Sequence, residues 1–153
     1  MKSRGTFSTA RLATGFTLVE LMLVMALVLI IGIFTSGVGV SYYQSQVLNE
    51  TADNLASTLR HAQGYALSGK INQAFGVYIH EDSYVMFEGQ SYESRIVAED
   101  MVFPISASIT ISGPVEVVFS ELTGTPDTTE TIYLSLGNRE KQIDILSSGY
   151  IDK

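Results

Sequence analysis

"TGFTLVELMLVMALVLIIGIF", residues 14–34, determines the fold of the first part of this 153-residue chain. No charged residue occurs from Leu21 to Val40, and the next one is Glu50. Twenty helical residues span about 30 Å, the thickness of the hydrocarbon core of a bilayer. The stretch therefore predicts a transmembrane helix over residues 16–40, in which Glu20 is the one acid.

The charges that flank this helix are asymmetric. Three bases precede Gly15, and no acid occurs before Glu20. By the positive-inside rule, the amino terminus is expected in the cytoplasm and the rest of the chain outside it. Gly15 lies before the apolar run, so cleavage there would remove a basic leader and keep the helix, unlike cleavage of an ordinary secretory signal.

Glu20 needs a partner at membrane depth, because a carboxylate there costs about 2.5–3.5 kcal/mol on insertion scales. The alternative interpretation is an ordinary acid near the interface that favours a helix amino terminus. Past the apolar run, Tyr42 and Tyr43 are typical of interfacial anchors.

Composition excludes several classes of chemistry. The chain has no cysteine, which excludes disulfides and thiolate metal sites. The leader holds three of the nine bases, so the remaining chain has six bases against sixteen acids and a net charge of −10. Such a chain is a poor candidate for unaided electrostatic binding to nucleic acid or anionic lipid. No phosphate loop, nucleophile elbow or zinc-protease motif occurs, so we expect no enzyme and no cofactor.

Residues 41–69 predict an amphipathic continuation of the helix, which we expect to run from about residue 16 to 68. The apolar residues recur in steps of three and four, which places them on one face. This stripe consists of Leu48, Ala52, Leu55, Leu59, Ala62 and Ala66. Gly69 then predicts a left-handed helix cap. The stripe needs a sheet to cover it.

Residues 70–153 predict that sheet, because apolar residues there alternate with polar ones. We expect three hairpins of short strands and a short tail, "GYID". The expected pairs are residues 74–79 with 84–88, "SITIS" with "EVVFS" around Gly113 and Pro114, and "TIYLSL" with "KQIDIL" around Gly137 and Asn138. The predicted fold is α+β, a long amino-terminal helix packed on an antiparallel β-sheet domain.

The amino-terminal sequence "ATGFTLVELMLVMALV" closely resembles the class III signal of type IV pilins and of the pseudopilins of type II secretion. The resemblance implies that residues 1–15 are a leader cut between Gly15 and Phe16 by a prepilin peptidase, with N-methylation of Phe16. It also implies that Glu20 is an assembly residue, whose carboxylate pairs with the new amino group of a neighbouring subunit.

The order of the predicted strands resembles the H-type minor pseudopilins and their FimT-like relatives, the GspH/FimT family. The closing "VVFSELTGTPDTTETIYLSL" and "IDILSSGYI" are similar to the final sheet of that family. The implied protein is a minor pseudopilin, anchored once in the bacterial inner membrane with a periplasmic domain, that enters a type II secretion pseudopilus. Its implied partners are other pseudopilins or pilins, the prepilin peptidase, the lipid bilayer and an inner-membrane assembly platform with a cytoplasmic ATPase.

Other functions have weaker support in the sequence. A FimT-like minor pilin that acts in pilus assembly or DNA uptake is the alternative, but only Lys153 is basic after Gly149. A membrane-tethered enzyme or sensor has no motif of its own. Residues 80–82 (His-Glu-Asp) are interpreted as a surface turn and residues 125–130 as an ordinary loop rather than a calcium site, so no metal ligand is expected.

Overall fold

The computed structural model describes residues 15–69 and 73–153, without the side chains of residues 34–39. Helix α1 (Leu18–Ser68) comes first. The elements that follow are β1 (Phe75–Ile79), β2 (Ser83–Glu88), the short 3₁₀ helix η1 (Val97–Glu99), β3 (Met101–Pro104), β4 (Thr110–Ser112), β5 (Glu116–Phe119), β6 (Thr131–Leu136), β7 (Arg139–Ile145) and β8 (Ile151–Asp152). The chain divides into two compact units, Met1–Val40 and Ser41–Lys153.

In the first unit, α1 carries apolar side chains on all sides. From Leu18 to Ile33 every side chain is exposed. Within the described part of the chain, no helix is both long enough and apolar enough to cross a bilayer. The predicted span, residues 16–40, includes residues 34–39, whose side chains lie outside the described set, and the predicted leader lies almost wholly outside it. The membrane span stays a prediction.

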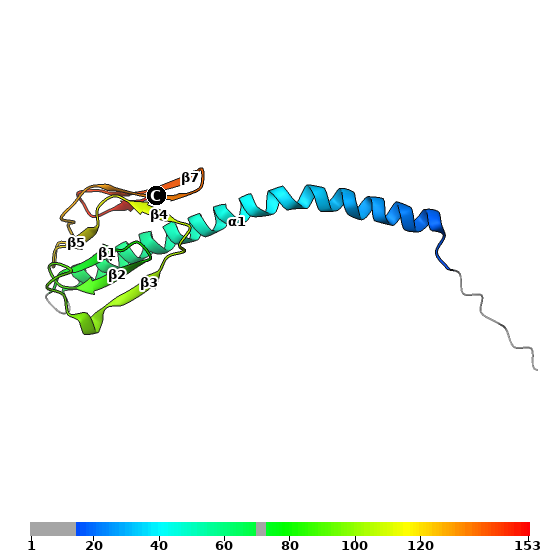
Figure 1. Ribbon diagram of the computed structural model, residues 1–153. Coiled ribbons are helices and arrows are strands. Elements are labelled where there is room, and N and C mark those ends of the chain that lie inside the picture. The colour runs from blue at the N-terminus through cyan, green and yellow to red at the C-terminus, as the bar shows by residue number, and fades with distance from the viewer. Residues whose placement is uncertain (1–14, 70–72) are drawn as a thin grey trace, which may run out of the picture. The chain divides into compact units, whose positions relative to one another are not determined.

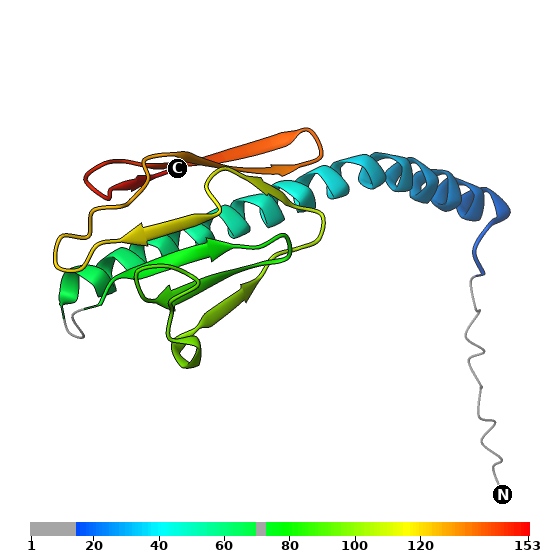
Figure 2. The same ribbon diagram turned by 60° about the vertical axis from the view of Figure 1, so that its left-hand side comes forward.

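The second unit contains two four-stranded antiparallel sheets rather than one. The strand orders are β3-β2-β1-β5 and β4-β6-β7-β8. Figures 1 and 2 show the two sheets side by side along the same part of α1. The predicted hairpins β1–β2 and β6–β7 are confirmed.

The predicted middle hairpin is wrong, because its two strands belong to different sheets. Strand β4 pairs with β6, and β5 pairs with β1. Gly113 has φ +133°, and a Cβ there would approach the Thr131 carbonyl oxygen to 2.7 Å. Residues 113–115 therefore link the edge strands of two neighbouring sheets instead of forming a turn.

One core joins both sheets to α1. All six residues of the predicted stripe are buried, which confirms the helix face. The sheets cover this face with Phe75, Val77, Met86, Val117, Phe119, Ile132, Leu134, Ile143, Ile145 and Ile151. Because short strands bury little area alone, packing against the helix stabilises both sheets.

Loops distant in sequence hold the carboxyl-terminal part of α1. Gly69 adopts φ +57°, the left-handed conformation expected of a helix cap. The Leu122 N–H donates to the Ala66 carbonyl oxygen (2.9 Å), which satisfies one of the free carbonyls of the last turn. Arg60 Nη2 donates to the Ile151 carbonyl oxygen (2.8 Å) and so attaches β8 to the helix.

Candidate processing and assembly site

The amino terminus of α1 is capped by its own sequence. The Glu20 backbone N–H donates to Thr17 Oγ1 (3.2 Å), and the Leu21 N–H donates to the Thr17 carbonyl oxygen (3.1 Å). Thr17 is therefore the N-cap residue, and Glu20 is the third residue of the helix. Thr-x-x-Glu is the sequence of a capping box. A carboxylate in the first turn also interacts favourably with the positive end of the helix dipole.

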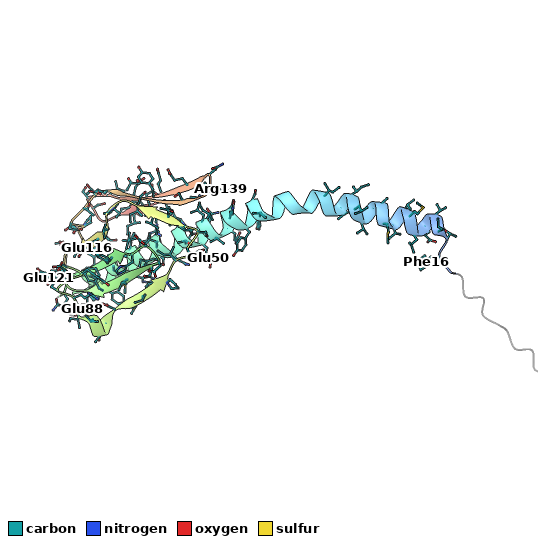
Figure 3. All side chains as sticks on the ribbon, viewed as in Figure 1. Phe16, Glu50, Glu88, Glu116, Glu121 and Arg139 are labelled. Carbon is teal, nitrogen blue, oxygen red and sulfur yellow. The ribbon has the colours of Figure 1, made fainter. Side chains whose placement is uncertain are left out.

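The predicted cleavage bond lies outside the helix. Gly15 and Phe16 precede the N-cap in non-helical backbone, and the Phe16 side chain is 81% exposed. A Cβ added at Gly15 would meet no atom within 4 Å in the described structure. The helix begins after Thr17, so the Gly15–Phe16 bond is not part of it. Figure 3 shows Phe16 at the start of α1.

Glu20 is the one acid on an otherwise apolar surface. Its side chain is exposed, and among the described residues its carboxylate has no hydrogen-bond or ion-pair partner. Large apolar side chains surround it, with Leu18 76%, Val19 72% and Leu23 61% exposed. An apolar surface of this extent marks an interaction site. The structure thus places the three predicted site residues, Gly15, Phe16 and Glu20, within six residues of one another at a helix end.

The residues considered for metal binding do not converge. No group of three His, Asp or Glu side chains within the described ranges could hold a metal ion. His80 Nε2 lies 2.9 Å from Tyr92 Oη. In the loop 125–130, Asp127 Oδ1 accepts the Val118 N–H (2.9 Å), so this carboxylate anchors the loop to β5.

The structure contains a side-chain cluster around Tyr92 that the sequence did not predict. The Tyr92 ring stacks on Tyr78 with centroids 4.0 Å apart, and the Arg95 guanidinium lies 3.7 Å from the ring centroid. The Tyr92 N–H donates to Glu116 Oε1 (2.7 Å). A hydrogen bond to Asp100 raises the pKa of Arg95 above its ordinary value. The cluster holds the loop 89–100 on the outer face of the first sheet. The loop has no periodic pattern of apolar residues, so its sequence does not predict these contacts.

Comparisons with known proteins place the fold. No family model and no curated protein matches the chain. Among solved structures, the crystal structure of the type IV minor pilin FimU of Pseudomonas aeruginosa is similar, with a TM-score of 0.58 and 18% sequence identity. The match covers 72% of this chain and 90% of FimU. The amino-terminal helix packed on antiparallel sheets is therefore a type IV pilin-like fold.

Proposed function

We propose that this chain is the precursor of a minor subunit of a type IV pilin-like filament. It is stored in the inner membrane through residues 16–40, with its carboxyl-terminal domain in the periplasm. A prepilin peptidase cuts it between Gly15 and Phe16, and Phe16 is N-methylated. An assembly platform with a cytoplasmic ATPase then moves it into the filament, because the chain has no nucleotide-binding motif of its own.

The observation that carries this proposal is the position of Glu20. It has no partner among the described residues, and it lies in the first turn of an exposed apolar helix, four residues after the predicted new terminus at Phe16. Cleavage creates the positive amino group that the carboxylate needs in an apolar filament core. Processing would therefore generate one half of the ion pair that joins neighbouring subunits. The pilin-like fold supports this role, since it is the fold of a structural subunit.

The secretion role is the finer part of the proposal. The resemblance to H-type minor pseudopilins, the GspH/FimT family, favours a type II secretion pseudopilus. The likeness to FimU, a type IV minor pilin, favours a pilus instead. Deletion of the gene in the parent bacterium separates the two. Loss of exported enzymes from the medium with normal pili supports the pseudopilus, and loss of pili or of DNA uptake with normal export supports the alternative.

Substitution of Glu20 tests the subunit role directly. We expect Glu20→Ala to be cleaved normally but to enter sheared filaments about tenfold less or worse, because the partner amine then lacks its counter-charge in an apolar site. Glu50→Ala is the matched control, since Glu50 is an exposed glutamate on the same helix and its removal should leave incorporation unchanged. Equal incorporation of Glu20→Ala and the parent protein would refute the proposal.

A further inference from the structure

The described residues include five lysine and arginine side chains, and three of them have partners. Arg60 donates to the Ile151 carbonyl oxygen, Arg95 pairs with Asp100, and Lys153 pairs with Asp53. Arg139 and Lys141 are exposed and have neither an ion pair nor a side-chain hydrogen bond within the described structure. The two described cations without a partner thus lie on one β-hairpin of a chain that is otherwise strongly acidic.

This hairpin lies at the amino-terminal end of the helix of its unit. Arg139 and Lys141 share a surface hollow of ≈ 310 Å³ with Glu140 of their own strand and with Ser45, Leu48 and Asn49 of α1. Farther along α1, Lys141 shares a second hollow with Ala52 and Asp53. Strand β7 therefore advances in the same direction as the helix, and the two-residue loop Gly137–Asn138 precedes both cations. Figure 3 shows Arg139 at this end of β7.

The two cations also share one face of their strand. Side chains alternate along β7, so Arg139 and Lys141 belong to the face of Ile143 and Ile145, which are buried against the helix. In the first half of the strand this face is exposed to solvent. There Arg139 and Lys141 lie beside the part of α1 that begins at Ser45. The cations are therefore held beside the helix and not distributed around the domain.

Two exposed tyrosines mark the same level of the helix. Tyr42 and Tyr43 are 71% and 68% exposed, and they precede Ser45 by three and two residues. At 1.5 Å per residue, the tyrosines and Ser45 lie within about 5 Å along the helix axis. Tyrosine is enriched where membrane helices meet the headgroup layer, and long basic side chains reach the same layer.

We propose that Arg139 and Lys141 bind the phosphate headgroups of anionic phospholipids and so orient the domain on the membrane before assembly. The inference rests on the membrane anchorage proposed above. Without residues 1–15 the chain has a net charge of −10, which opposes binding by charge alone, but the proposed membrane helix provides the affinity. The hairpin needs only to bias the orientation of a domain already held at the surface, where its local concentration is high.

The charge of the hairpin sets the size of the effect. A basic residue near an anionic surface favours the bound orientation by about fivefold, and a second base multiplies this factor. Glu140 lies between the two cations and is also exposed, so it offsets about one of them. We therefore expect a net preference of about fivefold for anionic over zwitterionic lipid, weakened by salt.

A fluorescent label at the hairpin tip measures this orientation. The chain has no cysteine, so the full-length variant Asn138→Cys takes one label at the loop before Arg139. The labelled protein is reconstituted into vesicles of phosphatidylcholine alone or of equal parts phosphatidylglycerol and phosphatidylcholine. Both kinds of vesicle carry a trace of lipid with a nitroxide quencher on its headgroup. Retention on the vesicles after alkaline extraction measures anchorage independently.

The label at the tip should be quenched more strongly in the anionic vesicles. The ratio of domains with the hairpin on the membrane to domains with the hairpin away from it should be about fivefold higher there. The paired substitutions Arg139→Gln and Lys141→Gln should abolish this difference, and Glu140→Gln should increase it. A label at Thr123 should show no lipid dependence. The neighbouring Leu122 contacts Ala66, about 30 Å along the helix from Ser45.

Three results would overturn the inference in distinguishable ways. Anchored protein whose tip is quenched equally in both vesicles, or equally after the paired substitutions, refutes the lipid contact and leaves the subunit role intact. Protein that is released by alkaline extraction refutes the anchorage, and with it both proposals. If quenching of the tip label changes only when other pilins are added, the hairpin binds a protein partner instead of lipid.

Discussion

The backbone N–H of Glu20 donates a hydrogen bond to the side-chain oxygen of Thr17, so the proposed assembly residue also lies in the cap of its own helix. This relationship marks where the helix begins, and it leaves Gly15 and Phe16 in non-helical backbone. A helix that began two residues earlier would include the Gly15–Phe16 bond, which is the proposed cleavage bond.

Removal of the Thr17 hydroxyl tests the cap. Loss of an N-cap costs about 1 kcal/mol, so Thr17→Val should speed amide exchange at Glu20 by about fivefold in detergent micelles. Thr17→Ser keeps the oxygen and should exchange at the parent rate. Nuclear magnetic resonance measures both, and equal exchange in Thr17→Val and the parent protein would show that the hydroxyl does not stabilise the helix start.

Arg60 attaches the last strand to the helix through the Ile151 carbonyl oxygen. Its side chain is exposed at the surface, so we expect Arg60→Met to lower the free energy of unfolding of fragment 41–153 by about 1 kcal/mol in urea titrations. Arg139→Gln removes an arginine without a partner in the described structure and should leave that free energy unchanged. Equal stabilities of the two variants would contradict the attachment.

Two glycines predict opposite effects of the same substitution. A Cβ at Gly76 would lie 2.8 Å from Phe87 Cε1 and 2.9 Å from the Val117 carbonyl oxygen, so Gly76→Ala should destabilise the unit by about 1–3 kcal/mol. Gly64 is helical and open, so Gly64→Ala should stabilise it by about 0.5–1 kcal/mol. Thermal unfolding of fragment 41–153 measures both, and the same sign for both would refute this packing.

Tyr84 predicts a loss of stability in alkali. Burial raises the pKa of its hydroxyl above the ordinary value of 10.0, and the hydrogen bond with Thr58 partly opposes that shift. The folded state therefore prefers the neutral phenol. Its contribution to stability is complete below about pH 10 and is lost as pH rises through the folded-state pKa.

Urea titrations between neutral and strongly alkaline pH measure this effect. Tyr84→Phe should reduce the fall in the free energy of unfolding above pH 10, since no phenol at position 84 remains to ionise. Tyr150→Phe removes the hydroxyl of an exposed tyrosine and serves as the matched control. An unchanged fall in Tyr84→Phe would show that Tyr84 is not the residue responsible.

Local patterns predicted most of the fold. The stripe from Leu48 to Ala66 predicted the buried helix face, and the hairpins β1–β2 and β6–β7 followed from short turns between adjacent strands. In the candidate site, the cap at Thr17 is also a local feature, because a capping box can be recognised from four consecutive residues.

Long-range pairing was not predictable in the same way. Gly113 and Pro114 have the composition of a turn, but the strands on either side pair with β6 and β1. Strand β3 was missed because it is an exposed edge strand, with Val102 62% exposed, and has no apolar alternation. Arg139 and Lys141 are ordinary strand residues in sequence, and only the structure shows that, within residues 15–69 and 73–153, three other cations have partners while these two have none.

The mass of the protein in the membranes of the parent bacterium shows whether residues 1–15 are removed and Phe16 is methylated. In membranes and in sheared filaments alike, we expect a chain that begins at Phe16 and carries one extra methyl group on its amino terminus. In a strain that lacks the prepilin peptidase, we expect residues 1–15 to be retained. A protein that keeps residues 1–15 while the peptidase is active would refute cleavage between Gly15 and Phe16, and with it the proposed role as a filament subunit.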